Sequence, residues 1–187
     1  MPENQGGLGV PERSVRWTEP PRSGTERVPL EIEAVDIEAL VQSVRLSLQE
    51  SALRSGIEIA LLTPRLEAVP LVAADRNLLQ QILMNLGTNA VEYNRLNGRV
   101  RIRISQPSRS RVRVAITDTG VGICSDQQAR LFDMAAASHT RSAAERAGGG
   151  LAMTKWWVEQ MGGELALWSQ VGSGSTFWID LPVHDAA

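Results

Sequence analysis

The stretch QILMNLGTNAVEYN, residues 81–94, is the part of this chain that decides its fold. Its apolar residues recur at helical spacing, and the stripe extends back to an aspartate cap, which predicts a helix from about Asp75 to Asn94. Asn85 and Asn89 lie one turn apart at the edge of this stripe, so their amides project side by side. An amide oxygen is a hard, neutral ligand, so the pair predicts a contact with Mg²⁺ and phosphate; the alternative is that both asparagines bond only backbone or water.

A second stretch, DTGVGI at residues 118–123, follows a predicted strand. Gly120 and Gly122 permit close approach of the backbone to a ligand and positive φ. The carboxylate of Asp118 could accept a hydrogen bond from the amino group of adenine, which guanine lacks. The alternative is an aspartate that caps a turn at a strand end, which is a common arrangement.

A third stretch, GGGLA at residues 148–152, precedes a helix predicted from about Gly150 to Met161. At such a position phosphates would meet unpaired backbone amides and the positive end of the helix dipole. The alternative is a flexible glycine linker, because no Walker-type lysine follows the glycines.

Outward from these stretches, periodicity and turn signals predict the remaining elements. We interpret residues 1–28 as a linker or disordered tail and residues 29–187 as one domain. Within the domain we expect strands over 28–35, 57–62 and 71–73, and a helix over 36–55 that Asp36 caps and whose apolar stripe runs from Ile37 to Ala52. We also expect a hairpin of strands around 100–104 and 112–116 with one solvated face, and a short helix over 126–132. A mobile lid over 133–147 and a final hairpin over 164–169 and 175–181 complete the expected order.

Composition excludes several classes of function. The 187 residues carry a net charge of −2, which provides no global field for nucleic acid. The single cysteine, Cys124, is compatible with the reducing cytoplasm. No apolar run reaches the length that spans a bilayer, so we expect a cytoplasmic location and no direct membrane contact from this chain.

The order of the three stretches resembles the catalytic, ATP-binding domain of bacterial sensor histidine kinases, a branch of the gyrase, Hsp90 and MutL ATPase superfamily. The resemblance covers roughly residues 30–182. It implies a Bergerat-type two-layer α/β sandwich, in which a mixed sheet has three main helices on one face.

The resemblance also implies a set of site residues. Asn85 and Asn89 would be the catalytic pair, and Asn89 would chelate Mg²⁺. Asn85 occupies the place where ATP-hydrolysing relatives carry a glutamate, which favours a kinase over an ATPase. The ATP-binding residues would be Asn89, Tyr93, Asp118, Gly120, Gly122, Gly148, Gly150, Leu151 and Thr176.

The chain departs from the family pattern at several positions. Glu92 stands where the family commonly has a lysine or arginine, Arg146 replaces a glycine, and Gly149 replaces a leucine. The stretch Phe132-Asp133-Met134 lacks the second aromatic of the usual box. These departures keep open the alternative of a regulatory or nucleotide-sensing module without kinase activity. A serine kinase of the anti-sigma type is a second alternative, because such kinases share the pocket and also lack an acceptor histidine.

The activity implied is transfer of the γ-phosphoryl group of Mg-ATP to a histidine. The partners implied are a histidine-bearing dimerisation domain of the parent kinase and a response regulator in a two-component system. His139 and Arg141 resemble the acceptor motif, but they lie in the predicted lid, so we interpret His139 as a solvated residue. The arginines of the hairpin would either contact an acidic partner or form a solvated face.

Overall fold

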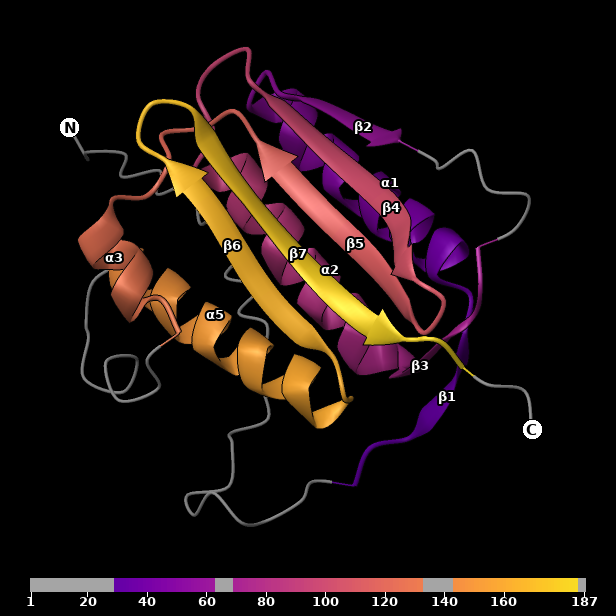
Figure 1. Cartoon of the computed structure of the whole chain (residues 1–187). Coiled ribbons are helices and arrows are strands. Elements are labelled where there is room, and N and C mark those ends of the chain that lie inside the picture. The colour runs from indigo at the N-terminus through magenta and orange to yellow at the C-terminus, as the bar shows by residue number, and fades with distance from the viewer. Residues whose placement is uncertain (1–28, 63–68, 133–142, 185–187) are drawn as a thin grey trace, which may run out of the picture.

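The computed structural model describes residues 29–62, 69–132 and 143–184, which Figure 1 shows as a sheet with helices packed against one face. The predicted linker over 1–28 and most of the predicted lid, residues 133–142, lie outside the described residues. No helix among those described is both long and apolar enough to cross a bilayer.

The first two long helices begin at aspartate caps, as predicted. In α1 (Ile37–Arg54) the Asp36 carboxylate accepts a hydrogen bond from the Ala39 backbone at 3.0 Å. In α2 (Arg76–Glu92) the carboxylate of Asp75 accepts one from the Leu78 backbone at 3.1 Å. These bonds satisfy donors that a helix otherwise leaves unpaired at its start.

The five-stranded sheet has the order β2-β4-β5-β7-β6. Its strands are β2 (Glu58–Leu62), β4 (Arg99–Ser108), β5 (Arg111–Asp118), β6 (Glu164–Gln170) and β7 (Gly174–Pro182). β2 pairs with β4 in parallel and the other pairs are antiparallel, so the sheet is mixed as predicted. A separate antiparallel pair joins β1 (Ile32–Val35) to β3 (Val72–Asp75), a contact that the sequence pattern did not predict.

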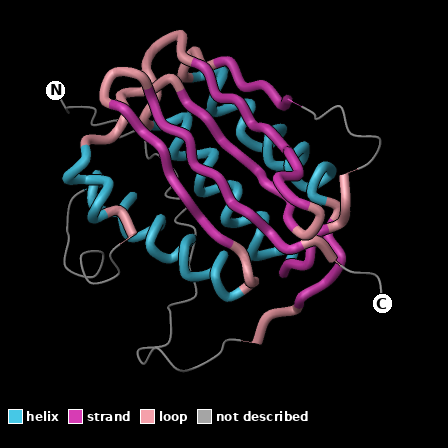
Figure 2. The backbone as a smooth tube through the Cα atoms, in the orientation of Figure 1, coloured by secondary structure: helices cyan, strands magenta, loops and turns pink. Residues whose placement is uncertain are grey.

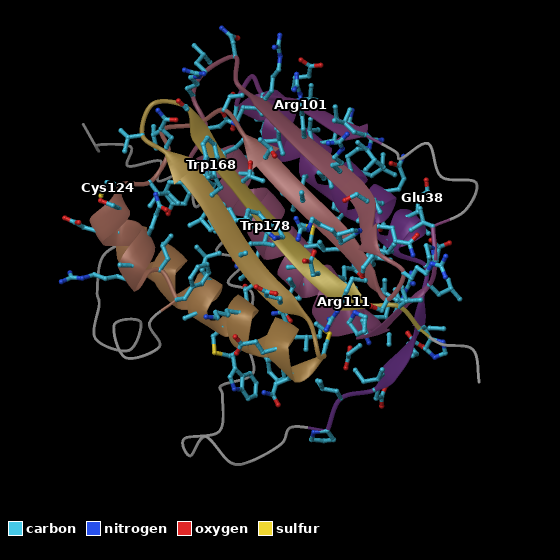
Figure 3. The ribbon with its side chains drawn as sticks, in the orientation of Figure 1. Glu38, Arg101, Arg111, Cys124, Trp168 and Trp178 are labelled. Carbon is cyan, nitrogen blue, oxygen red and sulfur yellow. The ribbon has the colours of Figure 1, made fainter. Side chains whose placement is uncertain are left out.

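One face of the sheet is buried and the other is open to solvent. Alternate residues of β5, among them Val112, Val114 and Ile116, are buried against the helices. Figure 2 shows α1, α2 and α5 (Ala143–Gln160) together on that side, which confirms the predicted two-layer sandwich with three main helices. On the opposite face Arg101, Trp168 and Trp178 project from the sheet (Figure 3).

The charged residues of the open face are partly paired with each other. Arg113 donates two hydrogen bonds of 2.6 Å to the Asp180 carboxylate and lies over the ring of Trp178. Arg99 pairs with Glu58. These charged side chains confirm the solvated face that the sequence predicted for the hairpin of β4 and β5.

The prediction for the last helix was wrong at its start. α5 begins at Ala143, not near Gly150, so Gly148–Gly150 lie inside the helix rather than before it. The preceding residues include Ala143, Ala144 and Ala147, and alanine has the highest helix propensity, so the helix extends N-terminally past the glycines. Short helix α3 (Ser125–Arg130) agrees with the prediction to within two residues.

Candidate nucleotide-binding site

The two asparagines of α2 lie on the side of the helix that faces α5, and their hydrogen bonding differs. The Asn85 side-chain nitrogen donates to the hydroxyl of Thr154 at 3.0 Å. The side-chain nitrogen of Asn89 is buried and has no hydrogen-bond partner among the described residues. A buried donor without a partner costs roughly 1–3 kcal/mol, so Asn89 is the group in this pair that a ligand would satisfy.

Asp118, the last residue of β5, is a buried carboxylate with one oxygen held by the backbone. Its Oδ1 accepts hydrogen bonds from Gly120 N at 2.8 Å and Ser175 N at 3.2 Å. The side chain is 7% exposed, and this burial raises the pKa of Asp118, an effect that the two backbone donors oppose. Among the residues described, Oδ2 makes no hydrogen bond, so it remains an acceptor for a ligand.

The loop after Asp118 is joined to the end of α2. The backbone N–H of Val121 donates to the Tyr93 carbonyl at 3.2 Å, and Tyr93 N in turn donates to Asn89 O at 3.0 Å. A side chain at Gly120 would collide with that same Tyr93 carbonyl oxygen and lie 2.8 Å from Asp118 Oδ1. Gly120 therefore lets the carboxylate loop approach the helix that carries Asn89.

The other side of this loop is fixed by the turn between β6 and β7. Gly122 has φ +71° and no room for a Cβ against the Gln170 carbonyl oxygen. Ser169 Oγ accepts a hydrogen bond from Ile123 N at 2.9 Å and lies 2.9 Å from Ser175 Oγ. The predicted roles of Gly120 and Gly122 in shaping the loop thus have a steric basis in this structure.

Tyr93 and Glu92 end α2 at the surface. Tyr93 is 41% exposed, and burial of part of the ring, followed by the charge of Glu92, raises the pKa of its phenol. The Glu92 side chain is exposed, in place of the cation that the family pattern has there.

Neighbouring residues of the third stretch, 148–152, have different surroundings. Gly150 packs on Asn85, because a Cβ there would lie 3.3 Å from the Asn85 oxygen. Leu151 is 4% exposed, and its side chain belongs to the hydrophobic core. With Gly148 and Gly150 inside α5, their amides are at helix-interior positions, where amides pair with the preceding turn.

The predicted contact of Thr176 with ATP does not agree with the place of this residue in the sheet. It pairs with Thr117, and their hydroxyls lie 3.0 Å apart on the open face of the sheet, away from the helices. Side chains alternate along a strand, so it is the neighbouring Ser175, 5% exposed, that faces Asp118. Strand alternation from the buried Phe177 is the sequence signal that would have selected Ser175.

Together the described elements bring Asp118, Gly120, Gly122, Tyr93 and Asn89 to one end of the sheet and helix layer. A family model described as histidine kinase-, DNA gyrase B-, and HSP90-like ATPase matches residues 74–185, more than half of the chain. This chain belongs to that ATPase family.

Relatives within the histidine kinase branch of this ATPase family are similar over most of the chain. The circadian input-output histidine kinase CikA of Synechococcus elongatus is 34% identical over 156 residues, which are 82% of this chain and 20% of CikA. The sensor histidine kinase ZraS of Escherichia coli is 35% identical over 156 residues, 83% of this chain and 32% of ZraS. The chain thus spans about a third or less of the length of these relatives.

Solved structures of the family have the same fold. Full-length ShkA in complex with AMPPNP superposes with a TM-score of 0.74 at 32% identity, covering 88% of this chain and 34% of ShkA. The catalytic domain of histidine kinase ThkA gives a TM-score of 0.70 at 22% identity, covering 82% of this chain and 97% of that domain. The two-layer sandwich is therefore the fold of a histidine kinase catalytic domain.

The residues present fit the ATP and Mg²⁺ that the ATPase family implies. Within the part of the chain that the structure describes, Asn89 offers a buried amide whose nitrogen lacks a partner, and Asp118 offers a carboxylate oxygen without one. Magnesium usually keeps waters and phosphate oxygens and takes few protein ligands, so one amide oxygen is a suitable protein contribution.

Proposed function

We propose that this domain binds Mg-ATP and transfers its γ-phosphoryl group to a histidine on a separate dimerisation domain. The observation that carries the proposal is the joining of Asp118 to the Asn89 helix, through the Val121–Tyr93 hydrogen bond and the close approach at Gly120. The names of the relatives, all sensor or circadian histidine kinases, and the AMPPNP bound by ShkA support it.

In this proposal Asp118 reads adenine. Two backbone donors hold Oδ1, which leaves Oδ2 to accept from the exocyclic amino group. A guanine presents a carbonyl oxygen at the same position, and two acceptors facing each other repel. Tyr93, at the adjacent helix end, lines the same side.

Asn89 would hold Mg²⁺ through its amide oxygen and donate its nitrogen to a phosphate oxygen. Bound Mg²⁺ supplies neutralisation of the phosphate charge during transfer. Asn85 would lie beside it, within the site, as the second polar group of the same helix face. The protein's contribution is positioning and electrostatic stabilisation.

Contact with phosphates through Gly148 and Gly150 would need their amides unpaired. We propose that the first two turns of α5 unwind on binding, up to Gly150. Glycine in a helix interior costs about 1 kcal/mol relative to alanine, so three successive glycines make this part of α5 the least stable.

The dimerisation domain of the parent kinase and a response regulator are the proposed partners, and the cytoplasm is the proposed location. Mg-ATP titration by calorimetry tests binding first. Phosphotransfer is then tested by adding the parent kinase's histidine-bearing domain with radiolabelled ATP and following an acid-labile phosphohistidine. Tight Mg-ATP binding without any phosphohistidine would remove the kinase proposal and leave a nucleotide-binding module.

A further inference from the structure

Thr154 is a fully buried polar residue in the middle of α5, and its hydroxyl makes two hydrogen bonds. It donates to the Gly150 carbonyl oxygen at 2.7 Å, one turn earlier in the same helix. It accepts from the side-chain nitrogen of Asn85 on α2 at 3.0 Å. A bond to the preceding turn is ordinary for a helical threonine, but the second bond crosses to another helix.

The chemistry of a hydroxyl fixes the direction of this chain of bonds. A threonine has one donor hydrogen, and Thr154 uses it on Gly150. Thr154 can therefore only accept from Asn85, so the amide of Asn85 must turn its nitrogen towards α5. The Asn85 oxygen then stays available as an acceptor, since no hydrogen bond to it is found within the described residues.

The same contact places Gly150, the last residue of the glycine run, against α2. A Cβ on Gly150 would lie 3.3 Å from the Asn85 oxygen and 3.4 Å from its nitrogen, so the asparagine lies flat against the glycine backbone. Gly150 is thus held from two sides, through its carbonyl by Thr154 and across its Cα by Asn85.

We propose that Thr154 is a positioning residue of the nucleotide site. It fixes Asn85 with its oxygen available as an acceptor, one turn before Asn89, and it holds Gly150, the end of the glycine run, against Asn85. The inference rests on the proposed function, since it assumes that Asn85 and the glycines contact the nucleotide.

The substitution Thr154→Val tests this role, because valine keeps the shape and removes the hydroxyl. We expect its affinity for Mg-AMPPNP, measured by calorimetry, to fall about five- to tenfold, the worth of one net hydrogen bond. Thr154→Ser keeps the hydroxyl and should bind within about twofold of the wild type. Thermal unfolding of both variants identifies the temperature range in which each is folded.

A nitrogen-15 NMR spectrum of the protein without nucleotide gives an independent readout. The side-chain amide signals of Asn85 should shift in the valine variant and return in the serine variant. Should valine prevent folding, the serine variant and Thr154→Ala carry the same comparison.

The outcomes separate the two proposals. If the wild type binds Mg-AMPPNP and the valine variant binds it with equal affinity, the positioning role of Thr154 is overturned, while the proposed function stands. Equal weakening in the valine and serine variants also overturns it, because the hydroxyl would then not be the cause. Absence of binding by the wild type overturns the proposed function, and the positioning role with it.

Discussion

The backbone N–H of Val121 lies 3.2 Å from the carbonyl oxygen of Tyr93, so the loop that follows Asp118 is hydrogen-bonded to the end of the helix that carries Asn89. Asp118 and Asn89 belong to different elements, β5 and α2, and this backbone bond brings the ends of the two elements together. The predictions below test what each part of this junction does.

Replacing Asp118 by asparagine should change which base the site accepts. Gly120 N and Ser175 N require an oxygen at the Oδ1 position, so the asparagine must turn its nitrogen outward. An outward donor repels the adenine amino group and suits the carbonyl oxygen of guanine. We expect ATP affinity to fall at least about tenfold and GTP affinity to rise relative to ATP, by calorimetric titration.

A control for this change is Asp118→Ala, which offers neither donor nor acceptor. It should weaken ATP without favouring GTP. Unchanged ATP affinity in the asparagine variant would show that the carboxylate does not contact the base.

The raised pKa of Asp118 predicts a pH dependence of stability. Burial makes the folded protein hold this proton more tightly than the unfolded chain, whose carboxyl has its ordinary pKa of 3.8. The stabilisation associated with the proton is fully present below pH 3.8 and is lost as the pH rises through the folded-state pKa. Denaturant unfolding at a series of pH values should show this loss in the wild type and a flatter profile in Asp118→Asn. Equal slopes for the two proteins would contradict the pKa shift.

Replacing Asn89 by alanine should cost function but little stability. Its buried nitrogen has no partner in the described ranges 29–62, 69–132 and 143–184, so the substitution removes a group that already carries a desolvation cost. We expect the free energy of unfolding to change by less than about 1 kcal/mol, while the gain in nucleotide affinity on adding Mg²⁺ is lost. Urea unfolding and calorimetry with and without Mg²⁺ measure the two effects.

Asn94→Ala provides the matched control on the same helix end. Its side chain donates to the Ala90 and Arg99 carbonyls at 3.0 and 3.1 Å and accepts from Thr119. The variant should therefore lose about 1–3 kcal/mol of stability. If Asn89→Ala were the more destabilised of the two, Asn89 would be a structural residue.

Local signals in the sequence predicted the helices and the strand pairs of both hairpins, whereas the sandwich was predicted from the family resemblance. Asp36 and Asp75 cap as expected, and the stripe from Ile37 to Ala52 is buried. The β1–β3 pair could not be predicted in this way, since its strands have four residues each and their pairing depends on tertiary contacts.

The errors in the site also have physical causes. The start of α5 was misplaced because glycine was taken as a helix boundary, whereas the alanines before it extend the helix. Thr176 was selected by its place in the family motif, without use of the side-chain alternation along the strand that points to Ser175. The hydrogen bond from Asn85 to Thr154 joins residues 69 positions apart and has no signal in a single sequence.

Adding a methyl group at Gly120 should disrupt the junction itself. In Gly120→Ala the new Cβ would collide with the Tyr93 carbonyl oxygen and crowd Asp118 Oδ1, so the loop must move away from α2. Gly163→Ala is the control, because its Cβ would lie 2.7 Å from the Asp180 carbonyl oxygen, at the opposite end of β7 from Ser175. Overpacking of this kind costs roughly 1–3 kcal/mol, so both variants should unfold at lower denaturant concentration. Only Gly120→Ala should also weaken Mg-ATP binding, by about tenfold or more, when calorimetry is done under conditions where both are folded. Equal affinities in the two variants would mean that the close approach at Gly120 serves stability and not the site.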